Sequence, residues 1–159
     1  MKENRPFPPI LSFVFLTIFI SLLICSCDDN SNNNPTPTPE PTANLEISFI
    51  PDPCAPVLSP DNERYEWIFT MIISETNGVS VELTDLYWLE HSNADRIKSF
   101  FGTYTVPGGG QIQAEFTVFK TLEEGGGGGP MKFTIIGIDA KGNDVSASKT
   151  LELLSYQGQ

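Results

Sequence analysis

Histidine is almost absent from this sequence, since His91 is the only one among 159 residues. A single imidazole cannot build the histidine-based metal clusters that zinc enzymes use. No serine stands in a Gly-x-Ser-x-Gly setting, and no glycine run is followed by the Lys-Ser or Lys-Thr pair of a phosphate-binding loop. The sequence therefore predicts no enzymatic activity and no cofactor.

Basic residues are also scarce, with 9 Lys and Arg against 20 Asp and Glu and a formal net charge of −11. This balance repels phosphate backbones and anionic lipid head groups. It excludes nucleic-acid binding and a polybasic membrane contact as working hypotheses.

A long apolar run occurs only at the N-terminus, over residues 10–24, after a start that carries Lys2 and Arg5. The run is shorter than the roughly 20 residues that a spanning helix needs, and acidic Asp28 and Asp29 follow it. This order is typical of a secretory signal peptide, which we assign to residues 1–26. A permanent transmembrane anchor is the alternative.

The tetrapeptide Ile24-Cys25-Ser26-Cys27 resembles the lipobox of bacterial lipoproteins. The resemblance implies cleavage before Cys27, a diacylglyceryl thioether on its sulfur and attachment to a bacterial membrane. Two or more acyl chains anchor a protein stably where one is marginal. Whether the inner membrane, the outer membrane or the cell surface holds the protein stays open.

Residues 27–43 contain Asn, Pro and Thr after the two aspartates and no large apolar side chain. Such a segment cannot bury enough surface to offset the entropy of ordering, so we expect a disordered stalk. The folded domain then spans residues 44–159 and retains one thiol, that of Cys54. This thiol is expected to be a small buried apolar group, with an intermolecular disulfide or a reactive thiol as the alternatives.

The domain sequence alternates apolar and polar residues with period two, as strands with one buried face do. The apolar positions are Leu45, Ile47 and Phe49; Tyr65, Trp67, Phe69, Met71 and Ile73; Val79, Val81 and Leu83; Ile112, Ala114, Phe116 and Val118; Phe133, Ile135 and Gly137; and Val145, Ala147, Leu151 and Leu153.

Turn signals separate these runs, at residues 76–78, 107–110, 125–130 and 141–143. The glycine run 125–129 is expected to be a flexible hairpin loop. Six or seven short strands without a convincing helix predict an all-β fold, an antiparallel sandwich, with a small barrel as the competitor.

The segment from Phe133 to Val145 contains Asp139-x-x-Gly142-Asn143 and resembles the last hairpin of bacterial immunoglobulin-like domains. We expect Asp139 to accept hydrogen bonds from the turn amides, while Gly142 and Asn143 adopt left-handed conformations. Residues 73–81 also resemble a hairpin of such domains. The resemblance implies an immunoglobulin-like β-sandwich of six or seven strands that acts as an adhesive module, a spacer or a carbohydrate-associated unit, with no catalytic residues.

Exposed aromatic rings can stack on sugars, and the candidate ligand contacts are Tyr87, Trp88, Phe100, Phe101 and Tyr104. The alternative is that these rings close the core of the sandwich. Acidic residues cluster at Asp61 with Glu63 and at Asp139 with Asp144, where turn formation is favoured over a weak calcium site.

Taken together, the residues predict a cell-envelope lipoprotein with a non-catalytic domain that binds a protein or a glycan. The alternative is a structural accessory subunit, in which an edge strand or the Cys54 thiol pairs with a partner chain.

Overall fold

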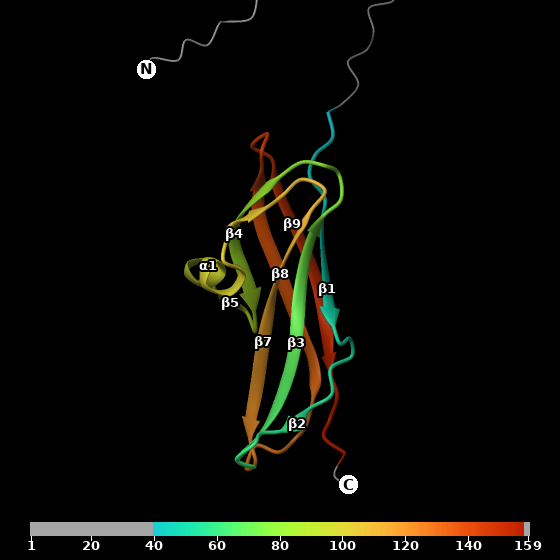
Figure 1. The fold of residues 1–159 in the computed structure, drawn as a ribbon, viewed down its shortest axis with the longest axis vertical. Helices are drawn as coiled ribbons and strands as arrows, with labels where there is room; N and C mark the ends of the chain where they lie inside the picture. The colour runs from blue at the N-terminus through green and yellow to red at the C-terminus, as the bar shows by residue number, and fades with distance from the viewer. Residues whose placement is uncertain (1–39, 158–159) are drawn as a thin grey trace, which may run out of the picture. The chain divides into compact units, whose positions relative to one another are not determined.

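The structure is a computed structural model that describes residues 40–157, and strands dominate that segment (Figure 1). The strands are β1 (Leu45–Ile50), β2 (Val57–Leu58), β3 (Arg64–Glu75), β4 (Val81–Trp88), β5 (His91–Ser92), β6 (Thr105–Val106), β7 (Gln111–Thr121), β8 (Gly129–Asp139) and β9 (Asp144–Leu153).

Two antiparallel sheets pack face to face. In the first, β3 is central, with β1 and β2 along one edge and β7 along the other. In the second, the order is β5-β4-β8-β9, and β6 also pairs with β4. The predicted all-β sandwich is therefore confirmed, with six long strands and three strands of two residues in the described part of the chain.

The core lies between the sheets and consists of the side chains that the alternation marks. On β3 the buried apolar residues are Trp67, Phe69, Met71 and Ile73, and their neighbours in sequence are more exposed. The rings of Phe49 and Phe69 in one sheet meet Phe133 of the other, with centroids 5.2 and 5.8 Å from it. These spacings are typical of favourable aromatic packing.

The prediction of a chain without helices is wrong for the link between β5 and β6. A 3₁₀ turn, Ala94–Arg96, leads into the helix α1, Ile97–Phe101. Ile97 is fully buried, and Phe100 and Phe101 pack against the core beside it, so one face of this short helix is apolar. Gly102 ends the helix with a φ of 74°, a conformation that glycine adopts without strain.

Residues 73–81 do not form the predicted hairpin. The strand before this segment, β3, lies in the first sheet, whereas β4 lies in the second. Both edges of β3 are already paired, one with β1 and β2 and the other with β7, so β4 cannot add to it. The segment crosses between the sheets, and so do residues 107–110 and 122–128.

A buried carboxylate holds two of these crossovers together. Glu75, at the end of β3, has 2% of its surface exposed. Its oxygens accept hydrogen bonds from the backbone N–H groups of Asn44, Asn77, Gly78, Val79 and Gly109, at 2.8–3.1 Å. Burial by itself raises the pKa of Glu75, but the N–H donors outweigh it and lower the pKa to about 2.

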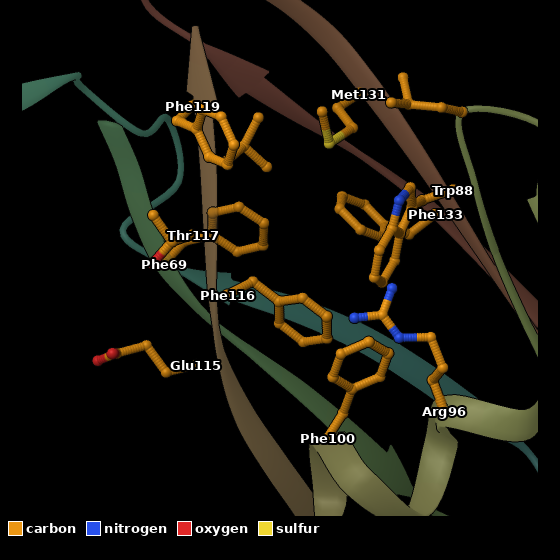
Figure 2. Close-up of a pocket in the computed structure, with 12 residues that line it drawn as sticks. Phe69, Trp88, Arg96, Phe100, Glu115, Phe116, Thr117, Phe119, Met131 and Phe133 are labelled. Carbon is orange, nitrogen blue, oxygen red and sulfur yellow. The ribbon is translucent and has the colours of Figure 1, made fainter. Parts of the chain in front are cut away.

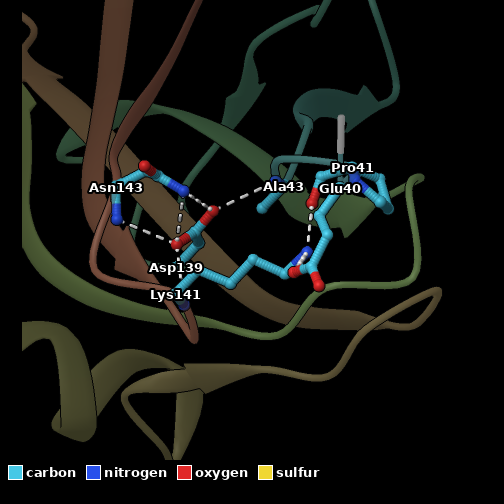
Figure 3. A network of polar contacts seen from close by, with 6 residues as sticks. All are labelled: Glu40, Pro41, Ala43, Asp139, Lys141 and Asn143. Carbon is cyan, nitrogen blue, oxygen red and sulfur yellow. Dashed lines mark hydrogen bonds and ion pairs between the residues drawn. The ribbon is translucent and has the colours of Figure 1, made fainter. Parts of the chain in front are cut away.

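The turn between β8 and β9 is built on Asp139, as predicted (Figure 3). Its carboxylate accepts hydrogen bonds from the Lys141 and Asn143 backbone N–H groups, both at 2.9 Å. Gly142 has the expected positive φ, 85°. Asn143 does not adopt a left-handed conformation; its side-chain amide donates to Asp139 instead, at 3.0 Å, and is the main cause that lowers the pKa of Asp139 to about 2.

The same turn binds the segment where the chain enters the domain. The Lys141 ammonium lies 2.8 Å from the Glu40 carboxylate and donates to the Pro41 carbonyl oxygen (Figure 3). The Ala43 N–H donates to Asp139, and Ala43 itself is buried. The domain therefore includes Ala43, one residue before the predicted boundary. The predicted signal peptide, Cys27 and most of the predicted stalk lie outside the described residues.

The glycine run between β7 and β8 is packed, which differs from the expected flexible hairpin loop. The carbonyl oxygen of Gly126 accepts a hydrogen bond from the Tyr156 N–H at 2.7 Å, and the Gly128 N–H donates to the Ser155 hydroxyl. A Cβ on Gly128 would lie 1.9 Å from the Leu153 carbonyl oxygen. The run therefore permits a close backbone approach to the chain after β9.

Cys54 closes one side of the sandwich. It lies between β1 and β2 yet forms a parallel bridge with Leu153 of β9, with hydrogen bonds from its N–H to Glu152 and from the Leu154 N–H to its carbonyl oxygen. The side chain is fully buried, and this burial raises the pKa of the thiol. The expectation of a buried apolar group is confirmed, and burial disfavours both a reactive thiol and a disulfide to a partner.

Candidate binding groove

The other side of the sandwich carries an aromatic groove (Figure 2). It lies between β7 of the first sheet and the segment that runs from the end of β4 to α1, and has a volume of about 340 Å³. The lining residues are Phe69, Trp88, Leu89, Arg96, Phe100, Glu115, Phe116, Thr117, Val118, Phe119, Met131 and Phe133.

Phe116 of β7 is the centre of the groove floor. Its ring centroid lies 5.1 Å from that of Phe100, 5.5 Å from Trp88 and 5.8 Å from Phe69. The Trp88 ring is perpendicular to Phe116, and the edge-to-face arrangement is favourable for two aromatic rings. These rings come from β3, β4, β7 and α1, so the floor exists only once both sheets and the helix are in place.

The rim contains a strained turn. Leu89 and Glu90 join β4 to β5 with φ angles of 48° and 63°, in the left-handed region that non-glycine residues rarely adopt. Leucine has no side-chain polar group that stabilises this conformation locally, unlike asparagine or aspartate. The turn leaves the Leu89 side chain 60% exposed at the edge of the groove.

Cationic side chains lie over the aromatic rings of the groove and of its continuation along β7. The Arg96 guanidinium carbon is 4.8 Å from the Phe100 ring centroid, and Figure 2 shows this side chain extending toward Trp88. Arg64 lies 5.2 Å from the centroid of Phe119. Both distances permit a cation–π attraction, which keeps the cations beside the apolar lining.

The predicted aromatic contacts divide into two groups. Trp88 and Phe100 line the groove, and Phe101 packs against Phe116 with ring centroids 6.1 Å apart. Tyr104 is 38% exposed and lies outside the groove. Tyr87 is also exposed and lines a neighbouring shallow depression with Lys132, which shares Trp88 and Leu89 with the groove.

The sequence interpretation missed Arg96, Leu89 and Phe119 as groove residues. The sequence does carry a signal for Phe119, because Phe116 and Val118 mark the inward-facing positions of this strand and Phe119 falls on the opposite face. In the structure Phe119 is 59% exposed. A large apolar side chain on the solvent face of a strand indicates a contact surface.

The acidic clusters take the turn-forming roles that were favoured. Asp61 accepts hydrogen bonds from the Ser59 hydroxyl and the Glu63 N–H, and these donors lower the pKa of Asp61. Within residues 40–157 no group of three His, Cys, Asp or Glu side chains is arranged to hold a metal ion. In the same segment no helix has the length and apolar character needed to cross a membrane.

No family model matches this sequence. No curated protein matches it either. Among solved structures, the chain resembles the X-ray structure of the Northeast Structural Genomics Consortium target SoR45, with 18% sequence identity and a TM-score of 0.47. The match covers 72% of this chain and 86% of that chain. Similarity at this level assigns neither a ligand nor an activity to the groove.

Proposed function

We propose that this chain is a lipid-anchored protein of the bacterial cell envelope whose β-sandwich binds a protein or glycan partner and catalyses no reaction. The observation that carries the binding function is the open aromatic groove between β4 and β7 (Figure 2). Its volume of about 340 Å³ falls within the usual range of ligand sites, and aromatic side chains form most of its floor.

The strained turn at the rim supports this function. Left-handed residues other than glycine cost on the order of 1–3 kcal/mol each and cluster at ligand-binding sites. Leu89 and Glu90 are two such residues in succession, and the result is a leucine side chain held in the open beside the groove. A turn selected only for stability would favour Asn-Gly at these positions.

The binding site is tested by changing the rim. Leu89→Asp adds a charge beside the groove without removing a core side chain, since Leu89 is largely exposed. We expect at least tenfold weaker binding to any ligand identified on a glycan array or from a displayed peptide library. Ile138→Asp, at an apolar residue that is 42% exposed on the outer face of β8, is the matched control and should bind as the unmodified protein does. Equal binding by both variants would exclude the groove as the site.

The lipid anchor rests on the lipobox resemblance at Cys27 and is tested separately. Cells that express the full chain with labelled palmitate should yield a protein that starts at Cys27 and carries acyl chains. Cys27→Ser should remove the label and leave the precursor uncleaved. An unlipidated chain that retains residues 1–26 would instead support the transmembrane alternative.

The accessory-subunit alternative is supported by the edge of β7 along the groove, which has no strand beside it within residues 40–157. The two functions differ in the partner: a glycan would stack on the rings, whereas a protein strand would also use the backbone of β7.

A further inference from the structure

We propose that β7 binds an extended peptide segment of a partner protein as an added strand, with one bulky apolar side chain inserted into the aromatic groove and an acidic residue next to it. The proposal rests on the binding function above and specifies the class of partner. Three independent features carry it: the orientation of the β7 backbone, the chemistry of the groove floor and the position of Arg96.

The first feature is a row of backbone groups that faces away from β3. The Glu75 N–H donates to the Gly110 carbonyl oxygen at 2.9 Å, so Gly110 directs its backbone toward β3. Neighbouring residues of an antiparallel strand direct theirs to opposite sides in alternation. The backbone N–H and C=O groups of Glu115, Thr117 and Phe119 therefore point away from β3.

Thr121 provides an independent check of this phase. Its N–H donates to the Glu124 carboxylate at 2.7 Å rather than to β3, as the alternation requires. Because the Glu124 carboxylate already accepts the Thr121 N–H, the unpaired edge of β7 ends before Thr121. In the described part of the chain β7 pairs with β3 alone, so the edge at Glu115, Thr117 and Phe119 has no strand beside it. An unpaired edge of this kind is a template for strand addition.

The second feature is that this edge forms one wall of the groove, which places a pocket directly beside the free backbone groups. The lining includes Glu115, Thr117 and Phe119, although Figure 2 shows the Glu115 side chain directed away from the aromatic rings. A strand paired with β7 would project every second side chain toward Phe116. The aromatic floor suits a bulky apolar side chain better than a sugar, which needs several hydrogen-bonding groups.

The third feature is the charge at the groove. The protein has a net charge of −11, yet Arg96 lines the groove, and no carboxylate within residues 40–157 pairs with its guanidinium. Glu115 is the carboxylate among the lining residues, and Figure 2 shows its side chain directed away from the aromatic rings. Glu90 belongs to the neighbouring depression, and Glu124 is held by Thr121. An acidic residue next to the inserted apolar side chain would complement Arg96, whereas acidic residues elsewhere would be repelled by the rest of the surface.

The experiment starts with a library of random 12-residue peptides displayed against the purified full chain in detergent. We expect enriched peptides to share a bulky apolar residue with Asp or Glu near it. Synthetic versions of the best binder, methylated at alternate backbone amides, should bind at least tenfold more weakly in one of the two methylation patterns, because that pattern removes the amides that pair with β7.

Two proline variants test the edge from the protein side. Thr117→Pro removes an N–H that faces away from β3 and borders the groove, and should weaken peptide binding at least tenfold. Gln113→Pro removes an N–H of the same orientation outside the groove, and should weaken binding much less than Thr117→Pro does. Circular dichroism establishes that each variant is folded, and the methylated peptides test the unmodified protein independently of either variant.

Several results would overturn the proposal. If both methylation patterns leave affinity unchanged but Leu89→Asp abolishes binding, the groove binds its partner without strand pairing, and only the strand-addition inference fails. If glycans bind at the groove and no peptide is enriched, the strand-addition inference also fails, while the groove is still the binding site. If the chain forms a dimer that Thr117→Pro dissociates, the occupant of the edge is a second copy. If neither peptide nor glycan binding responds to Leu89→Asp, the proposed function fails as well.

Discussion

Replacing Glu75 by alanine is expected to lower the free energy of unfolding by about 3–5 kcal/mol, because several backbone N–H groups around this buried carboxylate lose their acceptor at once. These groups belong to the start of β1 and to the two crossovers at residues 76–79 and 107–110. Urea denaturation at neutral pH measures the change. Glu46→Ala, at an exposed carboxylate on β1, is the control and should change stability by less than about 0.5 kcal/mol. A similarly small effect at Glu75 would contradict this role.

The same carboxylate makes stability depend on pH. The pKa of Glu75 is lowered from 4.5 to about 2, and that of Asp139 from 3.8 to about 2. A lowered pKa contributes stability that is complete above the unfolded value and is lost as the pH falls toward the folded one. The unfolding free energy should therefore decrease between about pH 4.5 and pH 2. Glu75→Gln cannot titrate, so this variant should be less stable at pH 7 and show a shallower decrease.

Gly128→Ala is expected to destabilise the domain by about 3 kcal/mol, the upper part of the range for an added methyl group without space. The new Cβ would lie 1.9 Å from the Leu153 carbonyl oxygen, and a backbone atom cannot move aside as a side chain can. The neighbouring Leu154 carbonyl accepts the Trp67 indole N–H at 2.9 Å. Displacement of this segment should therefore change tryptophan fluorescence as well as the midpoint of thermal unfolding.

Gly127→Ala is the matched control for this prediction. No atom lies within 4 Å of a Cβ built at Gly127, and its φ is outside the left-handed region. We expect a change of less than about 0.5 kcal/mol, with unaltered fluorescence. Equal tolerance of alanine at both positions would mean that the run is a flexible loop after all.

The strands themselves were predictable because their burial has period two. Leu45, Ile47 and Phe49 are all buried, and the exposed residues alternate with them. The pattern fails inside β4, where the register to β8 shifts between Leu83 and Asp85 and the buried phase resumes at Leu86. An extra residue at a bulge reverses which side chains face the core, and only pairing with β8 reveals it.

Connectivity was less predictable than strand position. The Asn-Gly pair at residues 77 and 78 is typical of a hairpin, yet here it belongs to a crossover. Local turn chemistry establishes that the chain reverses, but it contains no information on whether the partner edge is free. The edge of β3 is not free for β4, because β7 pairs with it from a distant part of the chain.

The sequence by itself determined the strand pattern and the turn at Asp139, because each depends on residues close together in the chain. The export signal and the lipidation of Cys27 stay predictions from residues 1–27. The existence of the groove depends on the tertiary structure alone. Trp88 and Arg96 belong to one segment, and Phe116 of β7 meets them only when the two sheets pack and α1 covers part of their open side. The free edge of β7 has the same origin, since whether a strand lies at an edge is a property of the whole sheet and of no single segment.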